Sequence, residues 1–244
     1  MIKAYAKSDV GRVREMNQDA YYISESLDQV QLYMLADGMG GYNGGEIASK
    51  LAIQSAKSYI ENNFKEIEKD KDSIIQLVGS SIEYANMVVY EKAKENKELE
   101  KMGTTLEVCL IYNNRAFIGH VGDSRIYRIR KEFMRKLTQD HSYVQKLVKD
   151  GTITPEEAVY HPQKNMLMKA LGCNAFVEPD VMVKGFLKDD IIIMNSDGLT
   201  NLVSQEEMFR EAKKDIEQAP KELVKLANDK GGYDNITVIV IKNI

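Results

Sequence analysis

The chain has 244 residues, of which 43% are hydrophobic and 29% are charged. This composition is typical of a globular protein, and the length suits a single domain, residues 1–244, with a substantial core. The formal net charge of −4 gives no long-range attraction to phosphate backbones or anionic lipid, so nucleic-acid and membrane partners are not expected. The purest apolar runs, such as Ile191–Met194, are far too short to span a bilayer. We therefore expect a cytoplasmic protein.

Short β-like segments open the chain at residues 2–6, 20–26 and 30–37, where β-branched and aromatic residues are frequent. The period then changes. Apolar residues recur every three or four positions from Glu46 to Glu61 and again from Ile74 to Val89. That spacing predicts two amphipathic helices joined by a charged link.

Strand character returns in a block made of residues 104–112, 115–122, 124–130 and 133–138. Between the first two segments stand Asn113 and Asn114, and asparagine tolerates the positive φ of a tight turn. We interpret this block as a meander of antiparallel strands.

From Gln139 to about Leu171 the strand pattern breaks into short helical pieces. In one of them Pro155 follows Thr154, which is typical of a helix start with a capping threonine. We interpret residues 140–171 as a flap subdomain.

The last part of the chain predicts strands, helices and a closing strand, in that order: 177–186, 189–196, 204–215, 220–230 and 235–243. Runs of strands and runs of helices are segregated along the sequence, which favours sheets with helix pairs packed outside them. We predict an α+β fold, with a central antiparallel β-sandwich flanked by pairs of helices in αββα layers.

Aspartates stand at the ends of predicted strands, each close to a glycine or an asparagine: Asp19, Asp37, Asp123, Asp197 and Asp234. Any one of them alone is most simply a turn. Their recurrence indicates that several carboxylates converge at one edge of a sandwich, in the oxygen-rich arrangement that Mg²⁺ and Mn²⁺ prefer. Gly38 fits this interpretation because its backbone carbonyl can approach an ion closely.

Motifs along the whole chain resemble one protein family. In order, they are Arg14-x-x-Asn17-Gln18-Asp19, LADGMGG (35–41), MGTT (102–105), GHVGDSR (119–125), LTQDHS (137–142), KALG (169–172), NSDGL (195–199) and GGYDNITVIV (231–240). From about Gly11 to Val240 the sequence resembles the metal-dependent protein phosphatases, the PPM or type 2C family. It is most similar to the compact bacterial serine/threonine phosphatases.

The resemblance implies a role for each matching residue. Asp37 would bridge two metals, with the Gly38 carbonyl on one of them, and Asp197 and Asp234 would hold the other. Asp123, with Asp197, would form a weaker third metal position. The remaining residues that it implicates are Arg14, which would grip the substrate phosphate, and Asp19 and Asn235, which would support the ions from outside the direct ligands.

The resemblance also implies an enzyme that hydrolyses phosphoserine and phosphothreonine in proteins with two Mn²⁺ or Mg²⁺ ions. A hydroxide between the ions would attack phosphorus without a phosphoenzyme intermediate, with Asp37 and Arg14 as the catalytic residues. Phosphorylated proteins would be the partners, including a bacterial serine/threonine kinase whose phosphorylation it reverses, and the chain would act as a monomer.

Two departures from the family pattern affect this interpretation. Met39 stands where animal relatives carry a histidine suspected of protonating the leaving group, so that proton donor is unassigned. Gln18 replaces a glutamate of those relatives, and we leave it out of the metal site. Two other functions stay open: a catalytically silent binding module on the same fold, and a phosphatase for small phosphomonoesters.

The other residues that commonly bind metals offer no competing site. The cysteines, Cys109 and Cys173, are too few for a disulfide framework or a zinc site, and we interpret both as structural thiols. The histidines, His120, His141 and His161, lack ligand-pair spacing and are also interpreted as structural.

Overall fold

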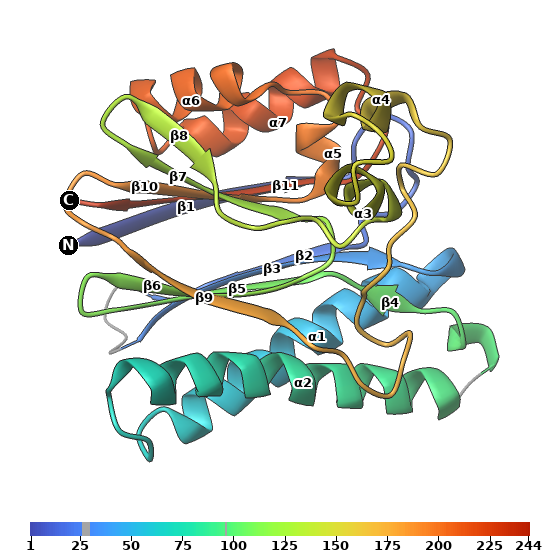
Figure 1. Ribbon diagram of the computed structural model, residues 1–244, viewed down its shortest axis with the longest axis horizontal. Helices are drawn as coiled ribbons and strands as arrows, with labels where there is room; N and C mark the ends of the chain where they lie inside the picture. The colour runs from blue at the N-terminus through green and yellow to red at the C-terminus, as the bar shows by residue number, and fades with distance from the viewer. Residues whose placement is uncertain (26–29, 96) are drawn as a thin grey trace.

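The computed structural model describes residues 1–25, 30–95 and 97–244, and consists of two antiparallel β-sheets packed face to face between layers of helices (Figure 1). The strands are β1 (Ile2–Asp9), β2 (Asp19–Ile23), β3 (Gln31–Met39), β4 (Gly103–Thr104), β5 (Leu106–Tyr112), β6 (Arg115–Val121), β7 (Arg125–Arg130), β8 (Phe133–Lys136), β9 (Asp180–Gly185), β10 (Ile191–Asn195) and β11 (Ile236–Asn243). The helices are α1 (Gly41–Asn63), α2 (Lys71–Glu95), the 3₁₀ turn η1 (Lys97–Leu99), α3 (Tyr143–Lys149), α4 (Pro155–Tyr160), α5 (Asp197–Thr200), α6 (Gln205–Lys214) and α7 (Ala219–Asp229).

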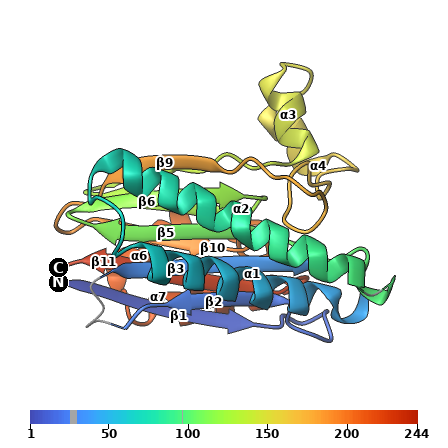
Figure 2. The same cartoon turned by 90° about the horizontal axis from the view of Figure 1, so that it is seen from below.

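One sheet has the strand order β1-β11-β10-β7-β8, and the other has the order β2-β3-β5-β6-β9 with β4 paired to β3. Helices α1 and α2 lie across the outer face of the second sheet, and α6 and α7 cover the first (Figures 1 and 2). The predicted αββα sandwich is confirmed. Among the described helices, none combines the length and the apolarity that a membrane crossing requires.

The core forms three layers because the central strands bury both faces. In β3, Met34 packs with the layer under α1 and α2, whereas its neighbour Leu35 packs between the two sheets. The layer under α6 and α7 is built around residues such as Leu223 and Val238. Alternation of side chains across a strand thus explains why β3 reads as a continuous apolar run.

The predicted meander is wrong in its pairing, although its strands are present. β6 pairs with β5 and β9 in one sheet, whereas β7 pairs with β10 and β8 in the other. The chain changes sheet at Gly122, whose φ of +120° favours glycine and where a Cβ would lie 2.4 Å from Thr105 Cγ2. Asp123 therefore lies at the crossing between the sheets and not in a hairpin.

Helix α1 begins at Gly41, five residues before the predicted start at Glu46. The glycines around the start of this helix allow it to pack closely on β3. A Cβ on Gly38 would lie 2.1 Å from the Gly45 carbonyl oxygen, and one on Gly45 would lie 2.7 Å from Gln18 Oε1. Tertiary packing here outweighs the low helix propensity of glycine.

Local predictions that depended on turn and cap chemistry are confirmed. Asn113 and Asn114 have φ values of 46° and 57°. Thr154 caps α4 in a capping box with Glu157. Helices α3 and α4 project from the end of the sandwich that is opposite the two termini (Figures 1 and 2).

Candidate metal centre and active site

A pocket of about 460 Å³ opens at the end of the sandwich near α3 and α4. Its lining is Arg14, Gln18, Asp37, Gly38, Met39, Gly40, Thr105, Asp123, Asn165, Leu167, Asp197, Asp234 and Asn235. The structure thus brings together every predicted direct metal ligand and the predicted phosphate-binding arginine.

Both sheets deliver carboxylates to this pocket. Asp37 lies near the end of β3, and Asp123 lies at the crossing from β6 to β7. Asp197 is the first residue of α5, directly after β10, and Asp234 stands just before β11. Because strand ends of the two sheets meet at this edge, residues distant in sequence share one pocket.

Each of these carboxyl groups is partly buried and lies close to others of the same charge. Burial raises the pKa of Asp37 well above its ordinary value, and the charges of Asp19 and Asp197 raise it further. Burial, followed by the charge of Asp197, raises the pKa of Asp123 to about 8. Burial and the charge of Asp234 raise the pKa of Asp197. A nearby cation would relieve this repulsion.

The donor set suits a hard divalent ion, because it consists of carboxylate and carbonyl oxygens. Within the part of the chain that the structure describes, no three His, Cys, Asp or Glu side chains are close enough to hold an ion by themselves. The donor types fit Mg²⁺ and Mn²⁺ better than zinc, because the residues that line this pocket include carboxylates but neither cysteine nor histidine.

Arg14 lies at the pocket and is half exposed, with 54% of its side chain accessible. Its Nη2 donates to Asp234 Oδ2 at 2.8 Å. The guanidinium therefore balances one of the carboxylates in this structure, and it is accessible enough to meet a ligand.

Asp19 is buried behind the pocket and is not part of its lining. It lies directly opposite Asp37 in the β2–β3 pairing. Its Oδ2 accepts hydrogen bonds from Ser196 Oγ at 2.8 Å and Thr237 Oγ1 at 2.6 Å, and burial raises its pKa to about 7. Among the described residues, its Oδ1 has no hydrogen-bond partner although it is buried.

Asn235 lines the pocket, and its side chain also holds the backbone of the segment that carries Arg14. Its Oδ1 accepts from the Gln18 backbone N–H at 2.8 Å. Its Nδ2 donates to the carbonyl oxygens of Val10 at 3.0 Å and Met16 at 2.9 Å. The N-terminal loop is thereby fixed to the loop of Asp234.

Several lining or positioning residues were missed by sequence reasoning. Thr105 Oγ1 accepts from the Asp37 backbone N–H at 2.9 Å, and Thr104 Oγ1 donates to the Asp37 carbonyl oxygen at 2.9 Å. The MGTT motif was the available sign for both threonines. Asn165 and Leu167 line the pocket from the region after α4, and no pattern marked them.

An antiparallel sandwich with helices outside and an acidic, oxygen-lined pocket at its edge suits metal-dependent hydrolysis. Residues 11–230 match the family model described as Protein phosphatase 2C, and the chain belongs to that family. The recognition from sequence motifs is confirmed.

Named relatives agree with this assignment. The chain is 37% identical to the protein phosphatase PhpP of Streptococcus pneumoniae, over 96% of this chain and 94% of that protein. It is similar to the solved structure of the serine/threonine phosphatase Stp1 from Staphylococcus aureus, with a TM-score of 0.91, 37% identity and coverage of 100% and 96%. It is also similar to the catalytic domain of the phosphatase PstP in complex with two manganese ions, with a TM-score of 0.86, 33% identity and coverage of 99% and 97%. The protein is a metal-dependent serine/threonine protein phosphatase of the bacterial type.

Proposed function

We propose that Asp37, Gly38, Asp123, Asp197 and Asp234 hold the divalent ions at which phosphoserine and phosphothreonine are hydrolysed. The observation that carries this proposal is the convergence of four carboxylates from both sheets in one pocket. The raised pKa values of Asp37, Asp123 and Asp197 support it, because carboxyl groups that are difficult to ionise alone are stabilised in their charged form by a divalent cation.

Asp37 and the Gly38 carbonyl oxygen would serve the two core ions, with Asp197 and Asp234 as ligands of one of them. Asp123, together with Asp197, would hold a weaker third ion. When bound, such ions supply an activated water nucleophile at neutral pH and neutralise charge on the phosphoryl group.

The protein's own groups perform the remaining tasks. Arg14 would exchange Asp234 for the substrate phosphate, which its planar guanidinium can bind through two parallel hydrogen bonds. Thr104 and Thr105 hold the backbone of Asp37 in place before the substrate binds. Binding therefore does not have to include the cost of ordering this residue. Asp19 supports Asp37 from the neighbouring strand. Met39 lines the pocket without a group that can donate a proton.

Residues 140–171 are proposed as the flap of a single catalytic domain, residues 1–244. A second cavity of about 390 Å³ supports this assignment, since residues of α3 and α4 line it together with Asp123 and Asp197. We propose that the segment of a protein substrate next to the phosphoresidue occupies this space.

Phosphorylated proteins are the substrates of this family, and we propose that they include a cognate serine/threonine kinase. Resemblance to compact bacterial phosphatases supports that partner. A monomer is sufficient for the reaction, because every residue proposed for the site comes from one chain. The free thiols of Cys109 and Cys173 suit the reducing cytoplasm, where we propose that the protein acts.

The deciding experiment measures phosphate release from a phosphothreonine peptide by purified protein with Mn²⁺ and with EDTA, beside a sugar phosphate as the small-molecule alternative. Asp37→Asn should abolish release and weaken Mn²⁺ binding, while Asp72→Asn, on an exposed position of α2, should retain both. Near-normal turnover by Asp37→Asn would mean that the site is misplaced. Faster hydrolysis of the sugar phosphate than of the peptide would instead favour a small phosphomonoester as substrate.

A further inference from the structure

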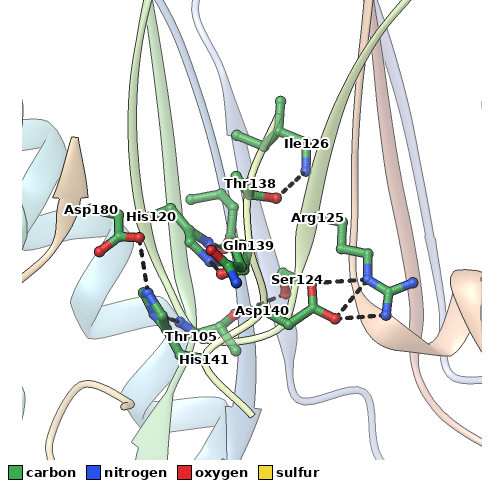
Figure 3. A network of polar contacts seen from close by, with 12 residues as sticks. Thr105, His120, Ser124, Arg125, Ile126, Thr138, Gln139, Asp140, His141 and Asp180 are labelled. Atoms are coloured by element: carbon green, nitrogen blue, oxygen red, sulfur yellow. Dashed lines mark hydrogen bonds and ion pairs between the residues drawn. The ribbon is translucent and has the colours of Figure 1, made fainter. Parts of the chain in front are cut away.

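A buried polar network lies next to Ser124 and Arg125, and its histidines take none of the roles described above (Figure 3). The rings of His120, on β6, and His141, after β8, stack with centroids 4.6 Å apart and planes inclined by 29°. Neither histidine lines the pocket of the carboxylates. Their ring nitrogens nevertheless reach groups that determine where Asp123 lies.

The inner part of this network is fully buried. Glu107 and His120 have no exposed side-chain surface, and Glu107 Oε1 lies 2.7 Å from His120 Nδ1. His120 Nε2 lies 2.9 Å from the carbonyl oxygen of Gln139, which can only accept, so Nε2 carries a proton. This pair fixes the segment after β8 against β5 and β6, and so fixes the backbone from which His141 extends.

His141 then meets the backbone of the crossing itself. The Gly122 N–H donates to His141 Nδ1 at 3.2 Å, and the His141 N–H donates to the Gly122 carbonyl oxygen at 2.7 Å. Since an amide N–H can only donate, Nδ1 carries no proton, and the ring proton lies on Nε2, which is 3.3 Å from Asp180 Oδ2. Burial lowers the pKa of His141, which agrees with a neutral ring.

The other side of the crossing is held as well. Ser124 Oγ lies 2.9 Å from Thr105 Oγ1, and that same oxygen accepts the backbone N–H of Asp37. Asp123 thus stands between two anchored neighbours, with Gly122 on His141 and Ser124 on Thr105. The conformation of Gly122 does not by itself fix the Asp123 carboxylate. Glycine adopts this positive φ without steric cost and can leave it as easily.

We propose that His141 is a positioning residue, which accepts the Gly122 N–H and thereby aims the Asp123 carboxylate into the metal pocket. The proposal rests on the proposed role of Asp123 at the weaker metal position. Groups that orient ligands from behind commonly change metal affinity about tenfold or more when removed. A residue with a purely structural role would lower stability without changing the weakest Mn²⁺ affinity.

Two substitutions of similar size and polarity separate these possibilities. In His141→Asn the side-chain oxygen can stand near the position of Nδ1 and accept the Gly122 N–H. In His141→Gln the amide extends towards the position of Nε2, and Gly122 loses its acceptor. His161→Gln is the matched control, because His161 Nδ1 accepts the backbone N–H of Gln163 at 3.1 Å on an exposed segment.

The first readout is hydrogen exchange of the Gly122 amide by NMR in metal-free protein, which needs neither substrate nor metal. The Gly122 amide should exchange about tenfold faster in His141→Gln than in the unchanged protein. In His141→Asn its exchange rate should stay within about threefold of the unchanged protein. The second readout is calorimetric titration with Mn²⁺ alone. The weakest affinity should fall about tenfold in His141→Gln and be rescued in His141→Asn, while His161→Gln changes neither quantity.

Unchanged Gly122 exchange in His141→Gln would overturn the proposal, and so would fast exchange in His141→Asn. If His141→Gln does not fold, the His141→Asn result alone still decides, because loss of Gly122 protection in it contradicts the acceptor role. Asp123→Asn separates the two levels of inference. If that variant keeps the weakest Mn²⁺ site while Gly122 exchange follows the pattern above, the assignment of Asp123 fails and the positioning of Gly122 stands.

Discussion

Asn235→Ala tests whether the Asn235 side chain holds the loop of Arg14 against the loop of Asp234. Asn235 is 5% exposed, and its side chain makes three hydrogen bonds, to the backbone of Val10, Met16 and Gln18. These partners are 217 to 225 positions away in the chain, and they flank Arg14. Truncation to alanine therefore removes the connection between the arginine loop and the loop of Asp234.

The expected loss of stability follows from those three bonds. Each is worth about 1 kcal/mol net, and a backbone group left without a partner costs about 1–3 kcal/mol when it stays buried. Because water can enter from the pocket side, we take the lower end, about 3 kcal/mol in all. For a chain of this length 1 kcal/mol corresponds to about 2–4 °C in Tm, so Asn235→Ala should melt about 10 °C lower.

Asn86→Ala is a closely matched control. Asn86 is 1% exposed, accepts from the Gly172 N–H, and donates to the carbonyl oxygens of Asn174 and Ala175. Both variants should lose similar stability in thermal unfolding with EDTA. Only Asn235→Ala should raise KM for a phosphopeptide, because it alone frees the arginine loop. A Tm within about 2 °C of the unchanged protein, or an equal rise of KM in both variants, would refute the reasoning.

Three further predictions concern the same pocket. Gly38→Ala should lower the free energy of unfolding by about 3 kcal/mol in denaturant titrations, because its Cβ would lie 2.1 Å from the Gly45 carbonyl oxygen; a wild-type midpoint would contradict the packing argument. Burial raises the pKa of Asp19 to about 7 and of Asp123 to about 8, so the folded protein keeps protons that the unfolded chain has lost above about pH 4. Metal-free protein should therefore lose stability as pH rises from about 5 to 8, and a Tm that rises over this range in EDTA would argue against it. Metal-free Asp123→Asn should be more stable than the unchanged metal-free protein at pH 8, by about 1–2 kcal/mol, and this difference should shrink at pH 5. An equal difference at both pH values would show that the effect does not come from ionisation of Asp123.

Much of the fold could be predicted because its elements carry local patterns. The continuous apolar run of β3 and the three-to-four spacing in α1 and α2 follow from burial of both faces of the strand and of one face of each helix. The sheet to which β7 belongs could not be predicted, since alternation identifies a strand and not its partner. The start of α1 was missed because the reason for its glycines, contact with β3, is tertiary.

The candidate site also contains residues that local sequence patterns reveal and residues whose roles depend on tertiary contacts. Its aspartates could be found from their repeated position at strand ends, and their convergence follows from the sandwich. Thr105 and Ser124, by contrast, are small polar residues among apolar ones, and their roles depend on the crossing at Gly122. Asn235 was predicted to support the ions, but its three contacts with distant backbone give it a wider task.

The pocket stays acidic because the cation nearest to Asp123 in the sequence is bound elsewhere. Arg125 Nε and Nη2 donate to Asp140 at 2.6 to 3.1 Å, and Lys136 Nζ donates to the same carboxylate at 3.1 Å. Burial raises the pKa of Asp140, but the charges and hydrogen bonds of Arg125 and Lys136 together outweigh burial and lower that pKa below the ordinary value. With its guanidinium held by a dedicated partner, Arg125 does not neutralise the cluster by contact. The charge that Arg125 leaves unbalanced makes the metal-free pocket unfavourable and, if these carboxylates are the ligands as proposed, favours the binding of a divalent cation.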